Sequence, residues 1–324
     1  MRRILIGGLT VWLATGVPAA AEQARPAGGG GPVILQQAPA DRAVSIPRAT
    51  LAQHLKDMDA RKLSTLRMIE GGKYNVNIRR ITNAETALVH PNTIDLWVVL
   101  EGSGTMTTGG KIANGKIVGG ESNPLKVGDV YFVPAGVPHG VSGVNGNITW
   151  LNVRWDVDWP ADAPLGAGRL PGGAVRPAPS AGGGAPRPGL APIEYAPTDR
   201  AIYIPKERLD QYRQDMAAKK VPTLRMIEGG HFNINIRRIA APSGEIHPLT
   251  IDTWVVLEGS GTIETGFKTD NGKPLLGSGT RVPAAVGDVL FVPAAHTHGF
   301  GAVNDVVAWL NIRWDVNWAK PAGQ

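Results

Sequence analysis

The chain has 324 residues, 43% of them hydrophobic, which is enough for two domains of ordinary size. It contains no cysteine, so disulfide bonds and thiolate metal sites are excluded. The formal net charge is +6, but several arginines fall in Pro/Gly-rich stretches and no basic stripe is interleaved with aromatic residues, which argues against nucleic-acid binding.

Residues 1–21 have the features of a removable export signal. Arg2 and Arg3 supply the positive start, Ile4–Val17 an apolar stretch, and Ala19–Ala21 the small-residue cleavage pattern. The alternative is a membrane anchor, but the uninterrupted apolar run is shorter than the roughly 20 residues that a bilayer span needs. We therefore expect an exported protein, periplasmic or secreted, without a stable membrane span after the signal is removed.

The rest of the chain is an internal duplication. Three pairs of closely matching segments lie 157 to 159 residues apart: Thr65–Gly72 with Thr223–Gly230, Trp97–Thr105 with Trp254–Thr262, and Trp150–Trp159 with Trp309–Trp318. The predicted organisation is a signal peptide at 1–21, a flexible lead-in at 22–40, a first domain at 41–159, a Pro/Gly-rich linker at 160–198, a second domain at 199–318 and a tail at 319–324.

Each domain is expected to open with one short amphipathic helix and to continue as strands. Apolar residues at helical spacing occur in both copies: Leu51, Leu55 and Met58 in the first, and Leu209, Tyr212 and Met216 in the second. After them the hydrophobic period changes to two, and Gly- and Asn-rich turns separate short segments. This pattern predicts an all-β fold, an antiparallel sandwich or barrel with one helix outside it.

Histidine and carboxylate residues recur at matching places in the two copies. In the second copy Glu245, His247 and Asp252 share one strand-like segment, and His298 follows a distant Gly-Asp turn. The first copy has His90, Asp95 and His139 at the corresponding places. Neutral imidazole nitrogen and anionic carboxylate oxygen together suit a divalent transition metal.

These segments resemble the two motifs of the cupin superfamily, whose domains are double-stranded β-helix jelly rolls. In the second copy His247, Asp252 and Gly259 fit the first motif, and Gly287–His298 fits the second, with Ala295 where glycine is usual. In the first copy the fitting residues are His90, Asp95 and Gly102 for the first motif, and Gly128, Pro134, Gly136 and His139 for the second. The resemblance implies tandem cupin domains, a bicupin, each preceded by one short helix.

The sequence departs from the family pattern at two places. The first family histidine is replaced by Leu88 in one copy and Glu245 in the other, and aspartate replaces the family glutamate in both. The resemblance therefore implies a reduced set of metal ligands: His90, Asp95 and His139 in the first domain, and Glu245, His247, Asp252 and His298 in the second. Glu245 is either a fourth ligand or a general base. The alternative in each domain is a structural His/Asp pair without metal, and His296 is interpreted as a rim residue.

The carboxylate content of these sites favours Fe or Mn, with Zn, Ni or Cu as alternatives. Trp97 and Trp254 share a strand face with the aspartates, so they either wall a substrate pocket or fill the core. Arg79 and Arg237 belong to alternating polar stripes for which a solvated outer face is the default. If the stripes point inward instead, these arginines would orient an anionic or hydroxylated ligand.

The favoured hypothesis is an exported metal-binding bicupin that acts on a small molecule as a dioxygenase, decarboxylase or isomerase. It would then be a metal-dependent oxidoreductase or lyase. The alternative is a non-catalytic bicupin that binds a small molecule or metal, or serves for storage. A homo-oligomer is compatible with either, and the fold alone does not choose between them.

Overall fold

The computed structural model describes residues 32–157, here called the first repeat, and 192–316, the second repeat. The predicted signal peptide, most of the predicted linker and the tail lie outside the described residues. The elements of the first repeat are β1 (Val33–Ile34), β2 (Val44–Ile46), α1 (Arg48–Arg61), β3 (Thr65–Glu70), β4 (Tyr74–Ile81), β5 (Thr93–Thr108), β6 (Lys111–Ala113), β7 (Lys116–Val118), β8 (Glu121–Lys126), β9 (Val130–Val133) and β10 (His139–Asp156).

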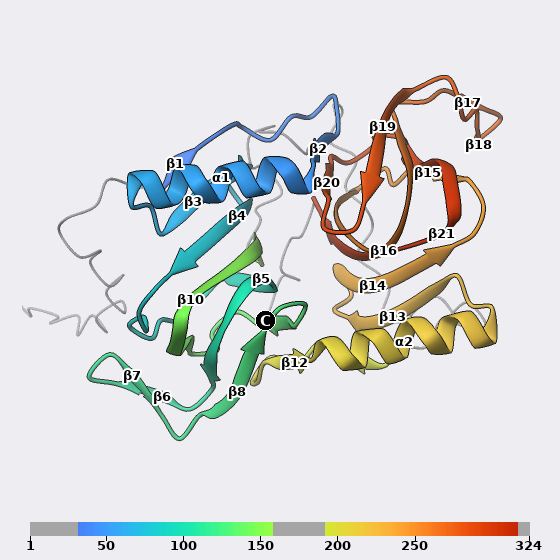
Figure 1. Ribbon diagram of the computed structural model, residues 1–324. Coiled ribbons are helices and arrows are strands. Elements are labelled where there is room, and N and C mark those ends of the chain that lie inside the picture. Colours follow the sequence, from blue (N-terminus) through green and yellow to red (C-terminus); the bar gives the residue numbers. More distant parts are fainter. Residues whose placement is uncertain (1–31, 158–191, 317–324) are drawn as a thin grey trace, which may run out of the picture. The chain divides into compact units, whose positions relative to one another are not determined.

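The second repeat has the same order with one extra short strand. Its elements are β11 (Glu194–Tyr195), β12 (Ile202–Ile204), α2 (Lys206–Lys219), β13 (Thr223–Glu228), β14 (Phe232–Ile239), β15 (Ser243–Glu245), β16 (Thr250–Thr265), β17 (Thr269–Asp270), β18 (Lys273–Pro274), β19 (Thr280–Ala285), β20 (Val289–Val292) and β21 (His298–Asp315). The prediction of a mainly β fold with one helix before each barrel is confirmed (Figure 1).

Each repeat forms one large sheet, and the two sheets exchange a strand. The first runs β1-β3-β4-β10-β5-β9-β12, with β8 also on β5. The second runs β11-β13-β14-β21-β16-β20-β2, with β15 on β21 and β19 on β16. Strand β2 thus pairs antiparallel with β20 of the second repeat, and β12 with β9 of the first. This exchange was not predicted from the sequence.

Parts of the predicted lead-in and linker are ordered strands. Val33–Ile34 pairs in parallel with β3, and Ala38 is buried. In the second repeat Glu194–Tyr195 pairs in parallel with β13 in the same way. The expectation of a flexible lead-in was therefore wrong for Val33–Ile34, and the second repeat begins within the predicted linker. Each segment completes the edge of a sheet and satisfies backbone groups there.

Carboxylates from the opposite repeat cap the two helices. Each helix begins after a proline, which offers no capping side chain. Asp288 accepts a hydrogen bond from the backbone N–H of Arg48 at 2.7 Å, and Asp129 accepts one from Lys206 at 2.9 Å. The first-turn N–H groups of a helix lack intrahelical partners and carry partial positive charge, so a carboxylate there is stabilising. These aspartates follow the glycines of the two Gly-Asp turns.

Removing either cap should destabilise the protein measurably. We expect Asp129→Ala and Asp288→Ala each to lower the free energy of unfolding by about 1–2 kcal/mol in urea denaturation. Asp57→Ala is the matched control, because Asp57 lies on the exposed side of α1 and accepts a hydrogen bond from Gln53. An equal loss in the control and the cap variants would contradict this role.

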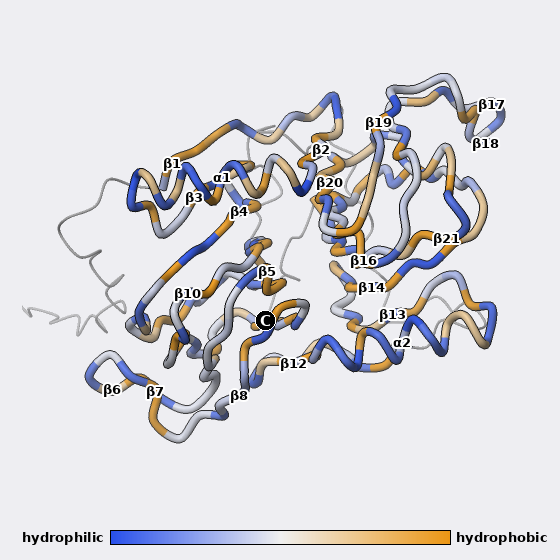
Figure 2. The backbone as a smooth tube through the Cα atoms, viewed as in Figure 1, coloured by the Kyte–Doolittle hydropathy of each residue, from blue (hydrophilic) through white to orange (hydrophobic). Residues whose placement is uncertain are grey.

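The buried side chains form a shared core and two barrel cores. The shared core combines the apolar faces of α1 and α2 with aromatic residues of both repeats, among them Trp155 and Trp314. Separate clusters fill the barrels around Trp97 in the first repeat and Trp254 in the second. Hydrophilic and hydrophobic residues alternate along both helices (Figure 2). Within the described part of the chain, no helix is long and apolar enough to cross a membrane.

Candidate metal centres

Strand register places the site residues on the inner face of each barrel. Asp95 on β5 lies opposite Arg154 on β10, and Trp97 lies opposite Asn152. Residues directly opposite each other in antiparallel strands project to the same face, and residues two apart share that face. The face that carries the Trp97 cluster therefore also carries Asp95, Asn152 and Arg154. The second repeat repeats this register with Asp252 opposite Arg313.

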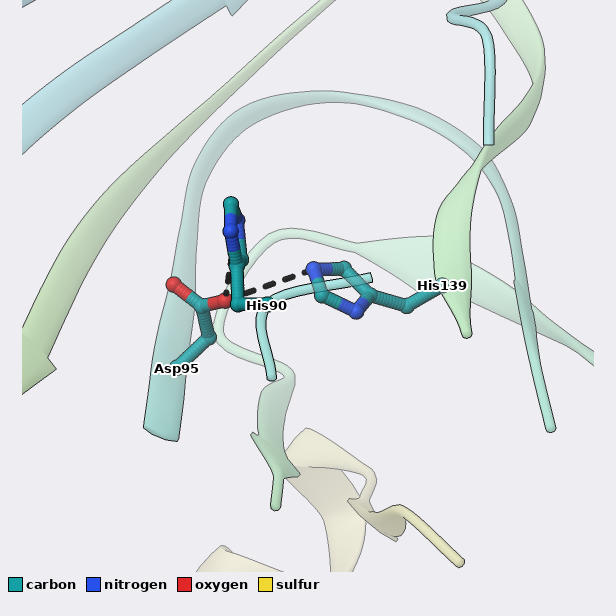
Figure 3. A group of neighbouring side chains, drawn as sticks. All are labelled: His90, Asp95 and His139. Atoms are coloured by element: carbon teal, nitrogen blue, oxygen red, sulfur yellow. Dashed lines mark ion pairs between the residues drawn. The ribbon is translucent and has the colours of Figure 1, made fainter. Parts of the chain in front are cut away.

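The first candidate centre consists of His90, Asp95 and His139. Oδ2 of Asp95 lies 3.3 Å from Nε2 of His139 and 3.6 Å from Nε2 of His90. Both imidazole rings are turned toward this carboxylate (Figure 3). Asp95 and His139 are buried, whereas the side chain of His90 is 28% exposed. The predicted residues of the first domain are thus brought together, with one ligand at the solvent side.

The second candidate centre adds a carboxylate. Nε2 of His298 lies 3.2 Å from Oδ2 of Asp252 and 3.8 Å from Oε1 of Glu245. Nε2 of His247 lies 3.4 Å from Oε2 of Glu245 and 3.9 Å from Oδ2 of Asp252. Candidate ligand atoms of Glu245, His247 and His298 all lie within 4.8 Å of one another, a group that does not include Asp252. All four predicted residues nevertheless converge on one place.

Glu245 and Leu88 occupy the same position in the two repeats. Glu245 pairs with His298 across β15 and β21, and Leu88 pairs with His139 in the same way. The two centres therefore differ by one carboxylate at an equivalent backbone position. This difference makes the second centre the more negative of the two in ligand charge.

Backbone carbonyls fix the orientation of one histidine in each centre. Nδ1 of His139 donates to the carbonyl of Val137 at 2.9 Å, and Nδ1 of His298 donates to that of His296 at 2.7 Å. A carbonyl only accepts, so the proton is on Nδ1 and the lone pair of Nε2 faces the aspartate. Burial is the main cause that lowers the pKa of His90 to about 4; the Asp95 carboxylate opposes this shift, and Arg154 adds to it. The ring of His90 is therefore neutral at pH 7.

Two arginines that the sequence analysis missed are part of the centres. Nε of Arg154 lies 2.7 Å from Oδ1 of Asp95, and Nε of Arg313 lies 2.6 Å from Oδ1 of Asp252. In each case the guanidinium engages one carboxylate oxygen and leaves Oδ2 facing the histidines. Nη2 of Arg313 also lies 2.6 Å from Nε2 of His247. The two arginines orient the aspartates. They also occupy lone pairs of the aspartates and of His247 that a metal ion could otherwise use.

The carboxylates are held in the charged form. Burial by itself raises the pKa of Asp95 and of Asp252, but Arg154 and Arg313, with the nearby histidines, outweigh it and hold each pKa well below its usual range. Burial likewise raises the pKa of Glu245, but its histidine and arginine neighbours lower it to about 2. A metal needs deprotonated carboxylates, so the protein environment already favours the ligand state.

Unsatisfied buried atoms fit a cation at these places. Oδ2 of Asp95, Oδ2 of Asp252, Oε1 of Glu245 and Nε2 of His298 are buried and have no hydrogen-bond partner. Buried polar atoms are normally satisfied, so four unpaired acceptors among facing ligands need an explanation. The donor set, imidazole nitrogen with carboxylate oxygen and no sulfur, is that of a borderline or hard divalent metal. The residues present therefore fit a metal ion.

The polar stripes point inward, so their interpretation as solvated outer faces was wrong. Asn77 and Asn235 are only 2% and 3% exposed. Arg79 forms an ion pair with Glu85, whereas Arg237 pairs with Glu245 at 3.0 Å. The strands carrying these residues are covered on both faces, because one face meets the barrel interior and the other the shared core, and alternation alone cannot show this.

The predicted pocket tryptophans lie beneath the histidines. Trp97 and Trp254 are buried and are members of the barrel cores. Their ring centroids lie 6.0 Å from that of His139 and 5.3 Å from that of His298, in edge-on arrangements. The two tryptophans therefore pack against the imidazole rings of His139 and His298. Their contact with a substrate stays a prediction.

Comparison with known proteins agrees with this architecture. A family model described as a cupin domain matches residues 82–153, which include His90, Asp95 and His139. The match lies within the first repeat, and the second repeat has the same order of elements, so the chain has the fold of two tandem cupin barrels. None of the curated proteins searched matches the chain in sequence.

Solved structures of similar fold include a dioxygenase. A salicylate 1,2-dioxygenase from Pseudaminobacter salicylatoxidans has a TM-score of 0.54 and 13% identity, covering 84% of this chain and 83% of the enzyme. A mutant of that dioxygenase in complex with gentisate has a TM-score of 0.51 and 13% identity, over 85% and 82% of the two chains. An oxalate decarboxylase has a TM-score of 0.40 and 16% identity, over 86% and 73%. At these identities the likeness to the two dioxygenase structures shows the fold alone.

Proposed function

We propose that this chain is a metal-dependent bicupin enzyme that acts on a small molecule, with oxidative chemistry as the leading reaction class. The observation that carries the proposal is the convergence of His247, Asp252 and His298, whose facing atoms are buried and in part unpaired. Two imidazoles and one carboxylate form the ligand set of non-haem Fe(II) oxygenases, in which further coordination positions stay open. The likeness in fold to a dioxygenase, which spans 84% of this chain, supports the same class.

The roles of the residues follow from their places. His90, Asp95 and His139 would hold one metal, and His247, Asp252, His298 and Glu245 the other, with Fe or Mn favoured. A bound metal of this kind supplies Lewis-acid polarisation and, if it is redox active, electron transfer to oxygen. Glu245 is either a ligand or a general base. Arg237 and its counterpart Arg79 would orient an anionic substrate, above the apolar floor that the tryptophans provide.

Oxygen consumption tests the proposal directly. Protein stripped of metal would be reloaded anaerobically with Fe²⁺, Mn²⁺ or Zn²⁺ and mixed with air-saturated salicylate, gentisate or oxalate. We expect substrate-dependent oxygen uptake with Fe²⁺ or Mn²⁺ and none with Zn²⁺, and the double variant His139→Ala/His298→Ala should abolish it. Carbon dioxide release from oxalate without oxygen uptake would move the assignment to decarboxylation.

One observation favours a non-catalytic binding protein instead. The guanidinium of Arg313 lies within hydrogen-bond distance of His247 Nε2, which is where a metal would take its lone pair. In that arrangement the cluster is a network of charged side chains that binds a small molecule without catalysing a reaction. Substoichiometric metal that is unchanged by His298→Ala, with no uptake of oxygen and no product from any probe, would support this alternative.

Export is a separate proposal, supported by residues 1–21 alone. We propose that the chain reaches the periplasm or the exterior after cleavage following the Ala19–Ala21 segment. Mass spectrometry of protein from the native cell would show a mature chain that begins near residue 22. A full-length chain retaining Met1 would contradict cleavage.

The carboxylate difference between the repeats gives a matched test of the metal sites. Glu245→Leu places in the second centre the residue that the first centre has at Leu88. We expect this change to weaken Mn²⁺ binding at the second centre by about 10- to 100-fold, because an anionic donor is lost. Calorimetric titration should then show two sites of similar affinity in place of two different ones. An unchanged binding curve would show that Glu245 does not contribute to the metal site.

A further inference from the structure

A cavity of about 220 Å³ lies in the first repeat, apart from the metal centre. It is half open to solvent and is lined on one side by the hairpin β6–β7, through Gly115, Lys116 and Ile117, and on the other by Gly140 and Ser142 of β10. On β10 the residue between the last two, Val141, is buried in the Trp97 cluster. The cavity therefore lies on the outer face of the barrel wall, behind the face that carries His139.

The second repeat has the same hairpin over the same wall. The turns at Asn114 and Asn271, each followed by a glycine, both have positive φ, and they join β6–β7 and β17–β18. The equivalence places Ile117 at the position of Pro274. Because Leu88 and Glu245 pair with equivalent histidines, the residues before them, Ala87 and Gly244, are also equivalent. Ala87 and Ile117 both line the cavity of the first repeat.

In the second repeat an aromatic ring occupies this space. Phe267 is 3% exposed. A Cβ atom built on Gly244 would lie 2.5 Å from the ring of Phe267 and 3.0 Å from Pro274. The phenyl ring thus packs against the counterparts of two cavity-lining residues. The matching position in the first repeat is Gly110, which brings no side chain.

A second sequence difference explains why only one repeat is filled. Glu264 is fully buried and accepts hydrogen bonds from the N–H groups of Gly277 at 2.6 Å and Gly279 at 3.0 Å, which fastens the loop that covers Phe267. The residue at this position in the first repeat is Thr107, which lines the cavity and pairs with Ser142 and another hydroxyl group. The first repeat therefore lacks both the phenyl ring and the buried glutamate that holds the loop in place.

We propose that the cavity of the first repeat binds a small aromatic ring that carries an anionic substituent. The ring is inferred from Phe267, which fills the equivalent space, and a cavity of about 150 Å³ already suffices for benzene. The anionic group is inferred from Lys116, which is exposed and lines the cavity. The other charged lining residue, Glu85, is engaged by Arg79.

The probe is phenylacetate, with benzylamine as the oppositely charged control. Calorimetry and saturation-transfer NMR on the purified full chain, with chelator present, should show one phenylacetate site and at least tenfold weaker binding of benzylamine. Ala84→Trp fills the mouth of the cavity at an exposed position and should abolish binding without affecting folding. Lys116→Gln should weaken phenylacetate binding by about threefold, the scale of one exposed charge pair.

A gain of binding gives the converse test. Phe267→Ala should open the equivalent space in the second repeat and raise the number of phenylacetate sites from one to two, with circular dichroism confirming the fold. Absence of phenylacetate binding to the unmodified chain would overturn the proposal. So would binding that persists in Ala84→Trp, because the ligand would then occupy another place.

Discussion

Replacing His298 with alanine is expected to reduce the metal content of the chain from two ions to one. His298 is 1% exposed, its Nδ1 is fixed by a backbone carbonyl, and its unpaired Nε2 lies 3.2 Å from the carboxylate of Asp252. Loss of one of two imidazoles should weaken Mn²⁺ or Fe²⁺ binding at the second centre by more than about 100-fold. Elemental analysis after dialysis, with calorimetric titration of the stripped protein, measures both effects.

The duplication supplies the controls for this experiment. His139→Ala should empty the first centre and leave the second loaded, and the double variant should bind no ion at either centre. His296→Ala is a close neighbour control, because only the backbone carbonyl of His296 supports His298. Two ions retained in His298→Ala, or one lost in His296→Ala, would contradict the assignment of the ligand.

Replacing Trp155 with alanine is expected to lower the free energy of unfolding by about 3–5 kcal/mol. The ring of Trp155 stacks on Trp314 of the other repeat with centroids 5.5 Å apart and an interplanar angle of 6°, and it also packs against Phe232. Both tryptophans are fully buried in the shared core. Truncation therefore removes contacts of both repeats and leaves a cavity.

The control for this substitution is an exposed aromatic residue. Tyr195 is 71% exposed, so Tyr195→Ala should change the free energy of unfolding by less than about 0.5 kcal/mol. Strands β2 and β12 are exchanged between the repeats. We therefore also expect Trp155→Ala to destabilise both repeats together, so that urea denaturation shows a single unfolding transition. Separate transitions, with only the first repeat affected, would show that the shared core does not couple the repeats.

Much of the fold could be predicted because the two copies of the duplication show the same hydrophobic patterns and turn residues. The change in period from helical to alternating placed α1 and α2 before the strands, and the buried faces include Leu51, Leu55 and Met58 as expected. The strand exchange could not be predicted, since β2 and β12 are three-residue strands whose sequences fit either sheet. The capping of the helices by Asp129 and Asp288 depends on that exchange, so it could not be predicted from the sequence either.

The histidines and carboxylates of the sites were identified from the sequence, but their arginine partners were not. Arg154 and Arg313 lie in the Trp-rich closing strands β10 and β21. A signal was present: Trp150, Asn152 and Arg154 alternate, so they share one face, and the second repeat has the same pattern. Which face points into the barrel depends on the sheet as a whole. For this reason the sequence left both directions of the Arg79 and Arg237 stripes open, with the outward one as the default.

Anomalous X-ray diffraction from crystals of the metal-loaded protein tests the central claim most directly. With Mn²⁺ or Fe²⁺ bound, we predict two anomalous peaks per chain, one among His90, Asp95 and His139 and one among His247, Asp252 and His298. The guanidinium of Arg313 should then have moved away from Nε2 of His247. Absence of both peaks, with Arg154 and Arg313 still paired to their aspartates, would contradict the account and show that the two centres are charge networks without metal.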